Sequence, residues 1–277
     1  MPRVAIATCL ELPEPDVDQE LVLDAFDQAE LNPVLAAWDD DAIDWAQFDA
    51  VVIRSTWNYP ERPQAFREWV ERVDGLTNLL NPARFVVPNI DKRYLFSLQQ
   101  DGVPIVPTTV IDQGLDSLGE IRSDRIVIKP AIGAGSYLTS FFDRADVAGM
   151  IEHIAEIEAA GTNALAQPFM ESVPHGGERS LVWIDDEITH KIVKQPRFSG
   201  GDESVSSTSV PVEPLELEMV NRVMATLPEM PLYARVDLIE DSGQFVVNEL
   251  ELIEPSLFFL QNPPAVDKLV KAVKRRL

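Results

Sequence analysis

The sequence has few of the residues that several common kinds of site require. It contains one cysteine, Cys9, and three histidines in 277 residues. A single cysteine excludes an internal disulfide and a cysteine-rich metal site, and it is typical of a reducing compartment. None of the histidines has metal-binding spacing such as HExxH, and no GxSxG elbow of a serine hydrolase occurs. These absences argue against hydrolases of both kinds.

Long hydrophobic runs are absent as well. The first twelve residues run apolar for only a few positions and have no small-residue cleavage site, and no later stretch approaches 18 apolar residues. We therefore expect a soluble, cytoplasmic protein with no membrane partner.

Positive charge is scarce, with 23 basic against 46 acidic residues and a net charge of −23. Such a field repels nucleic acids and anionic membranes, so neither is an expected partner. It also repels ATP. A nucleotide enzyme of this composition must therefore gather its few lysines and arginines in a cleft.

The first part of the chain alternates strand and helix patterns. Val4 to Thr8 and Ala50 to Ile53 are short apolar runs of the buried-strand type, and residues 21–31 have helical spacing between them. This rhythm predicts an open parallel sheet, in which ligands bind beyond the carboxyl ends of the strands. The polar run from Arg54 to Tyr59 falls at such an end. Asn81 to Asn89 is predicted to be a connection between units.

The rest of the chain predicts two mixed lobes. We therefore expect an α/β protein with an N-terminal unit at 1–90 and a second unit at 91–277, divided into a small lobe at about 105–165 and a large lobe at about 166–277. Apolar patterns predict helices and strands throughout this part, with Asp185-Asp186 as a two-residue hairpin turn. The polar, glycine- and serine-rich segment Arg197 to Ser209 is expected to be a mobile loop.

Two acids near the end of the chain share one face of a predicted strand. Alternation places Glu249 and Glu251 on the same side, together with Val247, about 7 Å apart. If Asp237 on the partner strand faces the same way, three carboxylates converge as Mg²⁺ requires, with Mn²⁺ as an alternative. A strand with one solvated face remains the simpler explanation of this pattern alone.

Basic residues accompany these acids at three positions. Arg235, two residues before Asp237, would share its face and could stabilise charge on a transferring phosphoryl group. Lys129 ends a buried-type strand and is followed by a turn with Gly133, Gly135 and Ser136, where exposed N–H groups can bind anions. Lys92 opens a predicted helix. Each motif by itself is also compatible with an ordinary surface feature.

Taken in order, these features resemble the ATP-grasp superfamily over about residues 85 to 260. The pattern Arg235-Val236-Asp237 … Asn248-Glu249-Leu250-Glu251 is similar to the Arg-x-Asp … Glu-x-Asn metal strand pair of that family, with Glu251 where asparagine is usual. The resemblance implies an ATP-grasp fold in which two α+β lobes clasp ATP. The spacing from Gln167 to Arg179 is similar to the glutathione synthetase branch.

The resemblance also implies roles for individual residues. Lys92 and Lys129 would contact the nucleotide phosphates, and Gly133 to Ser136 would form a flap over them. Gln167 to Met170, including Phe169, would bind adenine, and Arg179 would lie near the acceptor or the γ-phosphate. Because an acyl phosphate must be kept from water, the segment Arg197 to Ser209 is expected to act as a lid, with Lys191 and Lys194 facing phosphate or carboxylate; an ordinary surface loop is the alternative.

Three segments resemble, more narrowly, the cyclo-ligases of cycloserine biosynthesis and their relatives. These are Arg54 to Tyr59, Asn89 to Leu95 and Glu249 to Ser256. The resemblance implies closure of an isoxazolidinone ring on an O-ureidoserine at the expense of ATP. It also implies that Arg54, Ser55, Thr56 and Trp57 bind an amino-acid-like substrate.

The expected activity is therefore an ADP-forming ligase that activates a carboxylate as an acyl phosphate for attack by an amine, within one molecule or between two. A small-molecule kinase and a non-catalytic nucleotide-binding protein of the same fold remain open alternatives. The oligomeric state is open too, with a homodimer as one option.

Overall fold

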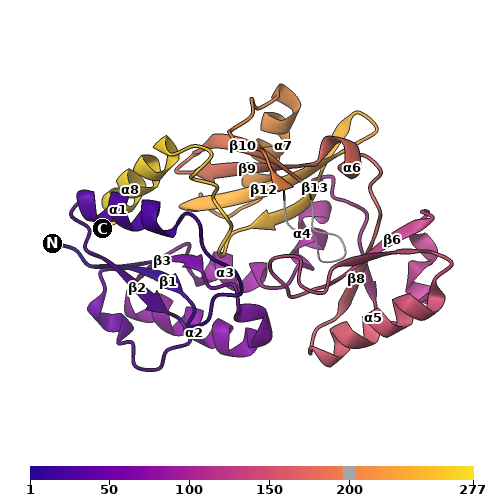
Figure 1. The fold of residues 1–277 in the computed structure, drawn as a ribbon, viewed down its shortest axis with the longest axis horizontal. Coiled ribbons are helices and arrows are strands. Elements are labelled where there is room, and N and C mark those ends of the chain that lie inside the picture. Colours follow the sequence, from indigo (N-terminus) through magenta and orange to yellow (C-terminus); the bar gives the residue numbers. More distant parts are fainter. Residues whose placement is uncertain (196–203) are drawn as a thin grey trace.

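The computed structural model describes residues 1–195 and 204–277, and these form three sheets with helices packed around them (Figure 1). Most of the expected lid, Arg197 to Ser209, falls on residues 196–203 and so lies outside the described part. Within that expected loop, Ser204–Val205 forms a short strand, β11, that pairs with the strand before it.

The first sheet is four-stranded and parallel, as predicted. Its order is β2-β1-β3-β4, with β1 at Val4–Thr8, β2 at Pro33–Ala37, β3 at Ala50–Ser55 and β4 at Asn78–Leu80. Every residue of β1 and β3 is buried, because helices cover both faces of the sheet. One face packs on α1 (Gln19–Gln28) and the other on α2 (Pro63–Leu76).

The segment that was predicted to be a simple connection contains a short helix, α3, at Ala83–Asn89. Asn81 and Asn89 flank it, and their side chains bond to backbone groups of β12, of β13 and of the residues beside these strands, at Leu232, Tyr233, Leu250 and Leu252. The two asparagines thus tie the first unit to the third sheet. The sequence predicted a polar connection here, but it could not indicate the partners of Asn81, because they lie about 150 residues away in sequence.

The second sheet is antiparallel, in the order β5-β8-β6-β7. It follows α4 (Tyr94–Gln100), and α5 (Val147–Ala159) packs on it. Its strands are β5 at Thr109–Ile111, β6 at Arg125–Pro130, β7 at Ser140–Asp143 and β8 at Ala164–Pro168. β8 runs across the expected lobe boundary at 165/166.

The third sheet, in the order β11-β10-β9-β12-β13, is also antiparallel. Its longer strands are β9 at Glu178–Ile184, β10 at Glu187–Gln195, β12 at Tyr233–Asp241 and β13 at Gln244–Glu251. Asp185 and Asp186 both have positive φ, 51° and 70°, which confirms the two-residue hairpin turn. The short helix α6 (Val173–Gly176) precedes this sheet, and α7 (Pro214–Met224) packs on one face.

Two β-bulges shift the register of strand pairs in the third sheet from the register that the hairpin turns alone would give. In the β12–β13 hairpin, Leu238 pairs with Val247 but Asp237 pairs with Glu249, so Asn248 is the extra residue. As a result Val247 packs in the core with Leu250, and the expectation that it shares a face with Glu249 was wrong. In the β9–β10 hairpin a second bulge between Ile188 and His190 brings Lys194 opposite Glu178.

A C-terminal helix, α8 (Pro264–Arg276), was not predicted. Its buried residues, among them Leu269 and Val273, pack with α1 and with the first sheet. The end of the chain therefore returns to the N-terminal unit, and both termini lie on the same side of the molecule (Figure 1).

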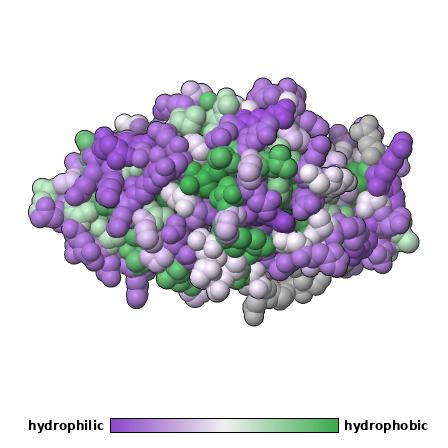
Figure 2. Space-filling model, turned by 90° about the horizontal axis from the view of Figure 1, so that it is seen from above, coloured by the Kyte–Doolittle hydropathy of each residue, from purple (hydrophilic) through white to green (hydrophobic). Residues whose placement is uncertain are grey.

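The surface agrees with the acidic composition. The face shown in Figure 2 is mostly hydrophilic, with hydrophobic residues gathered near its centre. Among the described residues, no helix has the length and hydrophobicity needed to span a bilayer.

Candidate active site

A cavity of about 410 Å³ lies where the three sheets meet. This volume is in the usual range for small-molecule sites. All three units contribute to its lining, including Trp57 and Tyr59 from the first, Lys129 and Gln167 from the second, and Arg235 and Glu249 from the third. The carboxyl end of β3 leads into it, as expected for ligand sites of parallel sheets.

The three predicted metal ligands converge at this cavity. One oxygen of each of Asp237, Glu249 and Glu251 lies within 4.8 Å of the others. Pairing of Asp237 with Glu249 and of Arg235 with Glu251 puts these four side chains on one face of the hairpin. Hard carboxylate oxygens at this spacing fit Mg²⁺, so the donor set suits the expected ion.

Cations neutralise these acids in the protein itself. The Arg235 guanidinium lies 2.9 Å from Asp237 Oδ1 and 2.5 Å from Glu251 Oε1, and Lys194 Nζ lies 3.0 Å from Asp237 Oδ2. Burial raises the pKa of Asp237, but Arg235 and Lys194 outweigh burial and hold it well below its ordinary value. Asp237 is thus an anion at any working pH.

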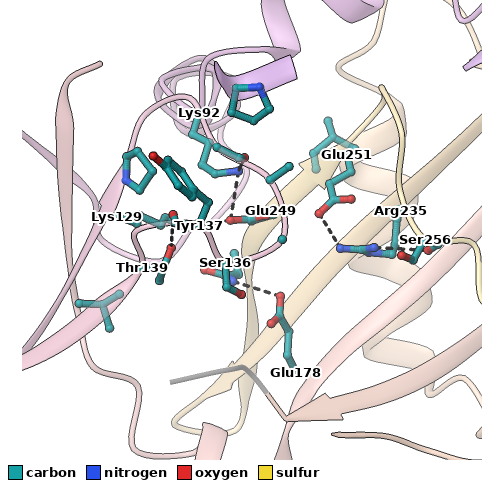
Figure 3. Close-up of a pocket in the computed structure, with 18 of the residues that line it drawn as sticks. Lys92, Lys129, Ser136, Tyr137, Thr139, Glu178, Arg235, Glu249, Glu251 and Ser256 are labelled. Carbon is teal, nitrogen blue, oxygen red and sulfur yellow. Dashed lines mark hydrogen bonds and ion pairs between the residues drawn. The ribbon is translucent and has the colours of Figure 1, made fainter. Parts of the chain in front are cut away.

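Lys92 and Lys129 meet Glu249 at the other side of the same face (Figure 3). Their ammonium groups lie 3.5 Å and 3.1 Å from Glu249 Oε1. Burial raises the pKa of Glu249, whereas the two lysines lower it to about 2. Both predicted phosphate-binding lysines are therefore in the cavity, next to the acids that were predicted to hold a metal.

The glycine turn forms the wall beside these lysines. Gly133, Gly135 and Ser136 line the cavity, and Lys92 Nζ donates to the Gly133 carbonyl at 3.0 Å. A Cβ at Gly133 would come within 2.9 Å of Pro130, and Gly135 has a φ of 58°. Glycine is therefore needed at both positions for this close, left-handed turn. Tyr137 and Thr139, which follow it, also line the cavity (Figure 3).

The expected adenine-binding segment lines the cavity too. Gln167, Phe169 and Met170 all face it, at the end of β8. Gln167 Nε2 donates to Thr108 Oγ1 at 2.9 Å, and the Arg125 guanidinium carbon stacks 3.9 Å from the centre of the Phe169 ring. Most of the predicted nucleotide site is thus brought together.

Arg179 is not brought into this group. It lies on the opposite face of β9, where it donates to the carbonyls of Gly176 and Gly177 at 2.8 Å and 2.7 Å. Lys191, which was also expected to face phosphate or carboxylate, is buried in an ion pair with Glu216 at 2.7 Å. Alternation along β9 puts Glu178, the residue before Arg179, in the cavity, and Lys194, which was expected to face it, lines it too.

The expected substrate residues at the end of β3 divide in two. Trp57 lines the cavity, whereas Arg54, Ser55 and Thr56 are fully buried beneath it. Arg54 Nη1 donates to the Pro255 carbonyl at 2.9 Å. None of these three residues lines the cavity, and Arg54 supports its wall from behind through this bond.

Several lining residues were missed in the sequence, among them Glu178, Glu254 and Ser256. Glu178 accepts from Asn248 Nδ2 at 3.1 Å and lies 3.7 Å from Lys194. Burial raises the pKa of Glu178 to about 7; the charge of Lys194 lowers it, whereas the charges of Asp237 and Glu249 raise it. The alternation of β9 could have identified Glu178, but Glu254 lies in an irregular segment that has no period.

Comparison with known proteins gives matches over the whole chain. Residues 4–81 match the family described as the N-terminal domain of the D-cycloserine synthetase DcsG. The chain is 31% identical over 288 residues to the cycloserine biosynthesis protein DcsG of Streptomyces lavendulae, which covers 95% of this chain and 94% of that protein.

Solved structures give the same result. The crystal structure of D-cycloserine synthetase DcsG has a TM-score of 0.88 at 28% identity and covers 99% of this chain and 100% of that one. An ATP-grasp RimK domain protein from Sphaerobacter thermophilus has a TM-score of 0.70 at 18% identity, covering 98% and 99%. The D-alanine–D-alanine ligase of Bacillus anthracis, also solved with ATP, has a TM-score of 0.67 at 14% identity, covering 100% and 99%. The last two likenesses concern the fold alone.

Proposed function

The chain belongs to the DcsG family of ATP-grasp ligases, and from this premise we propose that it is a Mg²⁺-dependent ligase that activates a substrate carboxylate as an acyl phosphate for attack by an amine. The expected ATP-grasp fold and ATP-dependent ligase activity are confirmed by this membership. The metal, the intermediate, the acceptor and the residue roles belong to the proposal.

One observation carries the proposal. Asp237, Glu249 and Glu251 lie together on the cavity face of the β12–β13 hairpin, next to Lys92 and Lys129. In a protein with a net charge of −23, this gathering of cations beside acids is where a polyphosphate and a divalent ion can be bound together. A structural salt-bridge network alone would not require a cavity of about 410 Å³ beside it.

The residues divide the work as follows. Asp237, Glu249 and Glu251 would hold Mg²⁺, which when bound neutralises phosphate oxygens and keeps ATP in a reactive position. Lys92 and Lys129 would bind the phosphates, the turn at Gly133, Gly135 and Ser136 would cover them, and Gln167 to Met170 would hold adenine. Arg235 and Lys194 would stabilise charge as the γ-phosphoryl group passes to the carboxylate.

No protein nucleophile is needed for this reaction. The carboxylate oxygen attacks the γ-phosphorus, ADP leaves, and the amine then attacks the acyl carbon and releases phosphate. The protein has to place the reactants and keep water out. We propose the first unit, residues 1–90, as the part that presents the acceptor, because Trp57 and Tyr59 enter the cavity from it.

We further propose that the amine belongs to the same molecule as the carboxylate, so that the product is a ring. The support is that similarity to a cycloserine biosynthesis protein extends over 95% of the chain. Attack by the amine of a second molecule, as in an ordinary ligase, is the alternative.

The test is release of ADP and phosphate with Mg²⁺, and with Mn²⁺ in its place, across a panel of amino acids and ureido amino acids that includes O-ureidoserine. Products are identified by mass spectrometry. Metal-dependent ADP formation with loss of water from one acceptor supports ring closure, whereas a condensed product of two molecules supports the ordinary ligase.

Two outcomes contradict the proposal. A stable phosphorylated product would indicate a kinase. Absence of metal-dependent ADP formation with every acceptor would count against the ligase proposal as a whole.

A further inference from the structure

The segment that follows β13 is held by side chains along its whole length. Six consecutive carbonyl groups, those of residues 252–257, each accept a hydrogen bond from a side chain of Asn81, Tyr233, Trp57, Arg54, Arg235 or His190, in that order. These donors come from the first unit, from β10 and from β12. A backbone fixed in this way presents the side chains of Glu254 and Ser256 to the cavity in defined positions.

Glu254 has no partner for its charge. Its residue is only 8% exposed, and its carboxylate forms no ion pair and no hydrogen bond with any other described residue, while its backbone carbonyl accepts a hydrogen bond from Trp57. Buried carboxylates are normally paired because desolvation penalises an isolated charge. Burial, followed by the charge of Glu251, accordingly raises the pKa of Glu254 to about 8.

The other acids of the third sheet that line the cavity are paired. Glu178 lies beside Lys194, Glu249 beside two lysines and Glu251 beside Arg235. The cations that act on Glu254 through space, Lys92 and Arg235, are bonded to those other acids. Among the buried acids that line the cavity, Glu254 is therefore the one that has no counterion in the described residues.

The missing counterion fits a ligand better than a second metal ion. Asp237, Glu249 and Glu251 form a metal-type cluster in the described residues, and Glu254 is not a member of it. Its neighbours in the cavity wall include Trp57, Tyr59 and Ser256, which offer aromatic faces and a hydroxyl group. Such surroundings suit a small organic cation.

We propose that Glu254 is the residue that binds the protonated α-amine of the amino-acid acceptor. Its carboxylate lies toward the lysines and the acids of the β12–β13 hairpin, and its ammonium group lies toward Glu254. This inference rests on the proposed function, in which that carboxylate is the group activated in the cavity.

The test compares amino acids with their deamino counterparts: serine with 3-hydroxypropionate, alanine with propionate, and O-ureidoserine with 3-(ureidooxy)propionate. Each compound is titrated by calorimetry into wild type and Glu254→Gln, in the presence of Mg²⁺ and the non-hydrolysable ATP analogue AMPPNP. Glutamine keeps the shape of the side chain and removes its charge. Glu254→Asp, which keeps the charge, is the second variant if glutamine perturbs folding.

We expect wild type to bind at least one amino acid about 30-fold or more tightly than its deamino counterpart, and Glu254→Gln to lose most of that preference while AMPPNP affinity stays the same. Glu254→Asp should keep part of the preference. Wild type without any such preference, or a preference that survives in Glu254→Gln, overturns the inference.

Failure of this inference and failure of the proposed function are distinguishable. A wild type that forms ADP with amino and deamino acids alike supports the ligase and removes the ammonium subsite. A wild type that binds amino acids selectively through Glu254 but never forms ADP keeps the subsite and removes the ligase chemistry.

Discussion

Among the described residues, Glu249 is the member of the carboxylate cluster that forms ion pairs with both Lys92 and Lys129. We expect Glu249→Gln to lower kcat by about 100-fold or more, because the change removes a metal ligand and leaves two lysine charges without their acid. The protein should remain folded, with a lower thermal unfolding temperature because two buried lysines lose their counterion. The measurement is steady-state ADP release with a circular dichroism melt, and Glu152→Gln on the exposed face of α5 serves as the control. Unchanged turnover in Glu249→Gln contradicts the metal assignment.

Glu254 also makes a prediction about stability. Its pKa is raised by burial and by Glu251 to about 8, so its contribution is fully present below its ordinary value of 4.5 and is lost as pH rises through about 8. Lys92, Arg235 and Glu251 are the charged groups that act on it. We expect the free energy of unfolding of the ligand-free wild type to fall relative to Glu254→Gln by about 1.4 kcal/mol per pH unit within this window.

Urea titrations of both proteins at pH 5, 7 and 9 measure this difference. A difference in stability that is independent of pH would contradict the raised pKa, and with it the view that the carboxyl is buried without a counterion.

Individual site residues could be predicted from the sequence where they belong to a strand or helix with a regular pattern. Asp237, Glu249 and Lys129 lie in strands and Lys92 lies just before a helix, and the structure brings these four residues together as expected. The family resemblance implied a site role for Arg179, whereas strand alternation puts Glu178, the residue before it, in the cavity. Glu254 could not be found, since its significance depends on the absence of a partner, which only packing reveals.

At the scale of elements, the clamped segment 252–257 gives a further prediction. Trp57→Phe keeps an aromatic ring in the cavity wall but removes the donor to the Glu254 carbonyl, a bond of 3.1 Å. We expect KM for the acceptor to rise about three- to tenfold, with KM for ATP unchanged, because one hydrogen bond of about 1 kcal/mol holds the position of Glu254.

A matched control is Trp69→Phe on α2, whose indole N–H is buried without a partner. This substitution changes a tryptophan of the core but removes no hydrogen bond to residues 252–257. Equal effects of the two substitutions on KM for the acceptor would mean that packing, rather than the bond to Glu254, is responsible.

Helices and strands were mostly predictable, and their register was not. Hydrophobic periodicity depends on nearby residues, and it predicts strands at 178–184, 187–193, 233–239 and 244–252, close to the observed bounds of β9, β10, β12 and β13. Bulges are set by packing across a whole sheet and leave no local signature. α8 was not predicted, although Pro264 at its first turn and basic residues at its end are helix signals.

For the whole molecule, the net charge of −23 predicts an unusual salt response. The cavity lysines attract ATP only at short range, while the surrounding acids repel it at long range. Salt screens the long-range part first, so kcat/KM for ATP should rise several-fold between about 20 and about 200 mM NaCl at fixed Mg²⁺. Initial-rate measurements at low ATP concentration check this, and a steady fall over the same range would contradict it.

The hydrogen bonds to residues 252–257 also limit how this chain can be recombined with its relatives. A crossover near residue 81 would take Arg54 and Trp57 from one parent and the carbonyl groups that they hold from another. Chimaeras joined there would contain both parts in full, yet residues 252–257, which carry the proposed acceptor-binding Glu254, would be misplaced. An exchange of the N-terminal unit should therefore include residues 252–257, although they are distant in sequence, because side chains of that unit hold this segment in place.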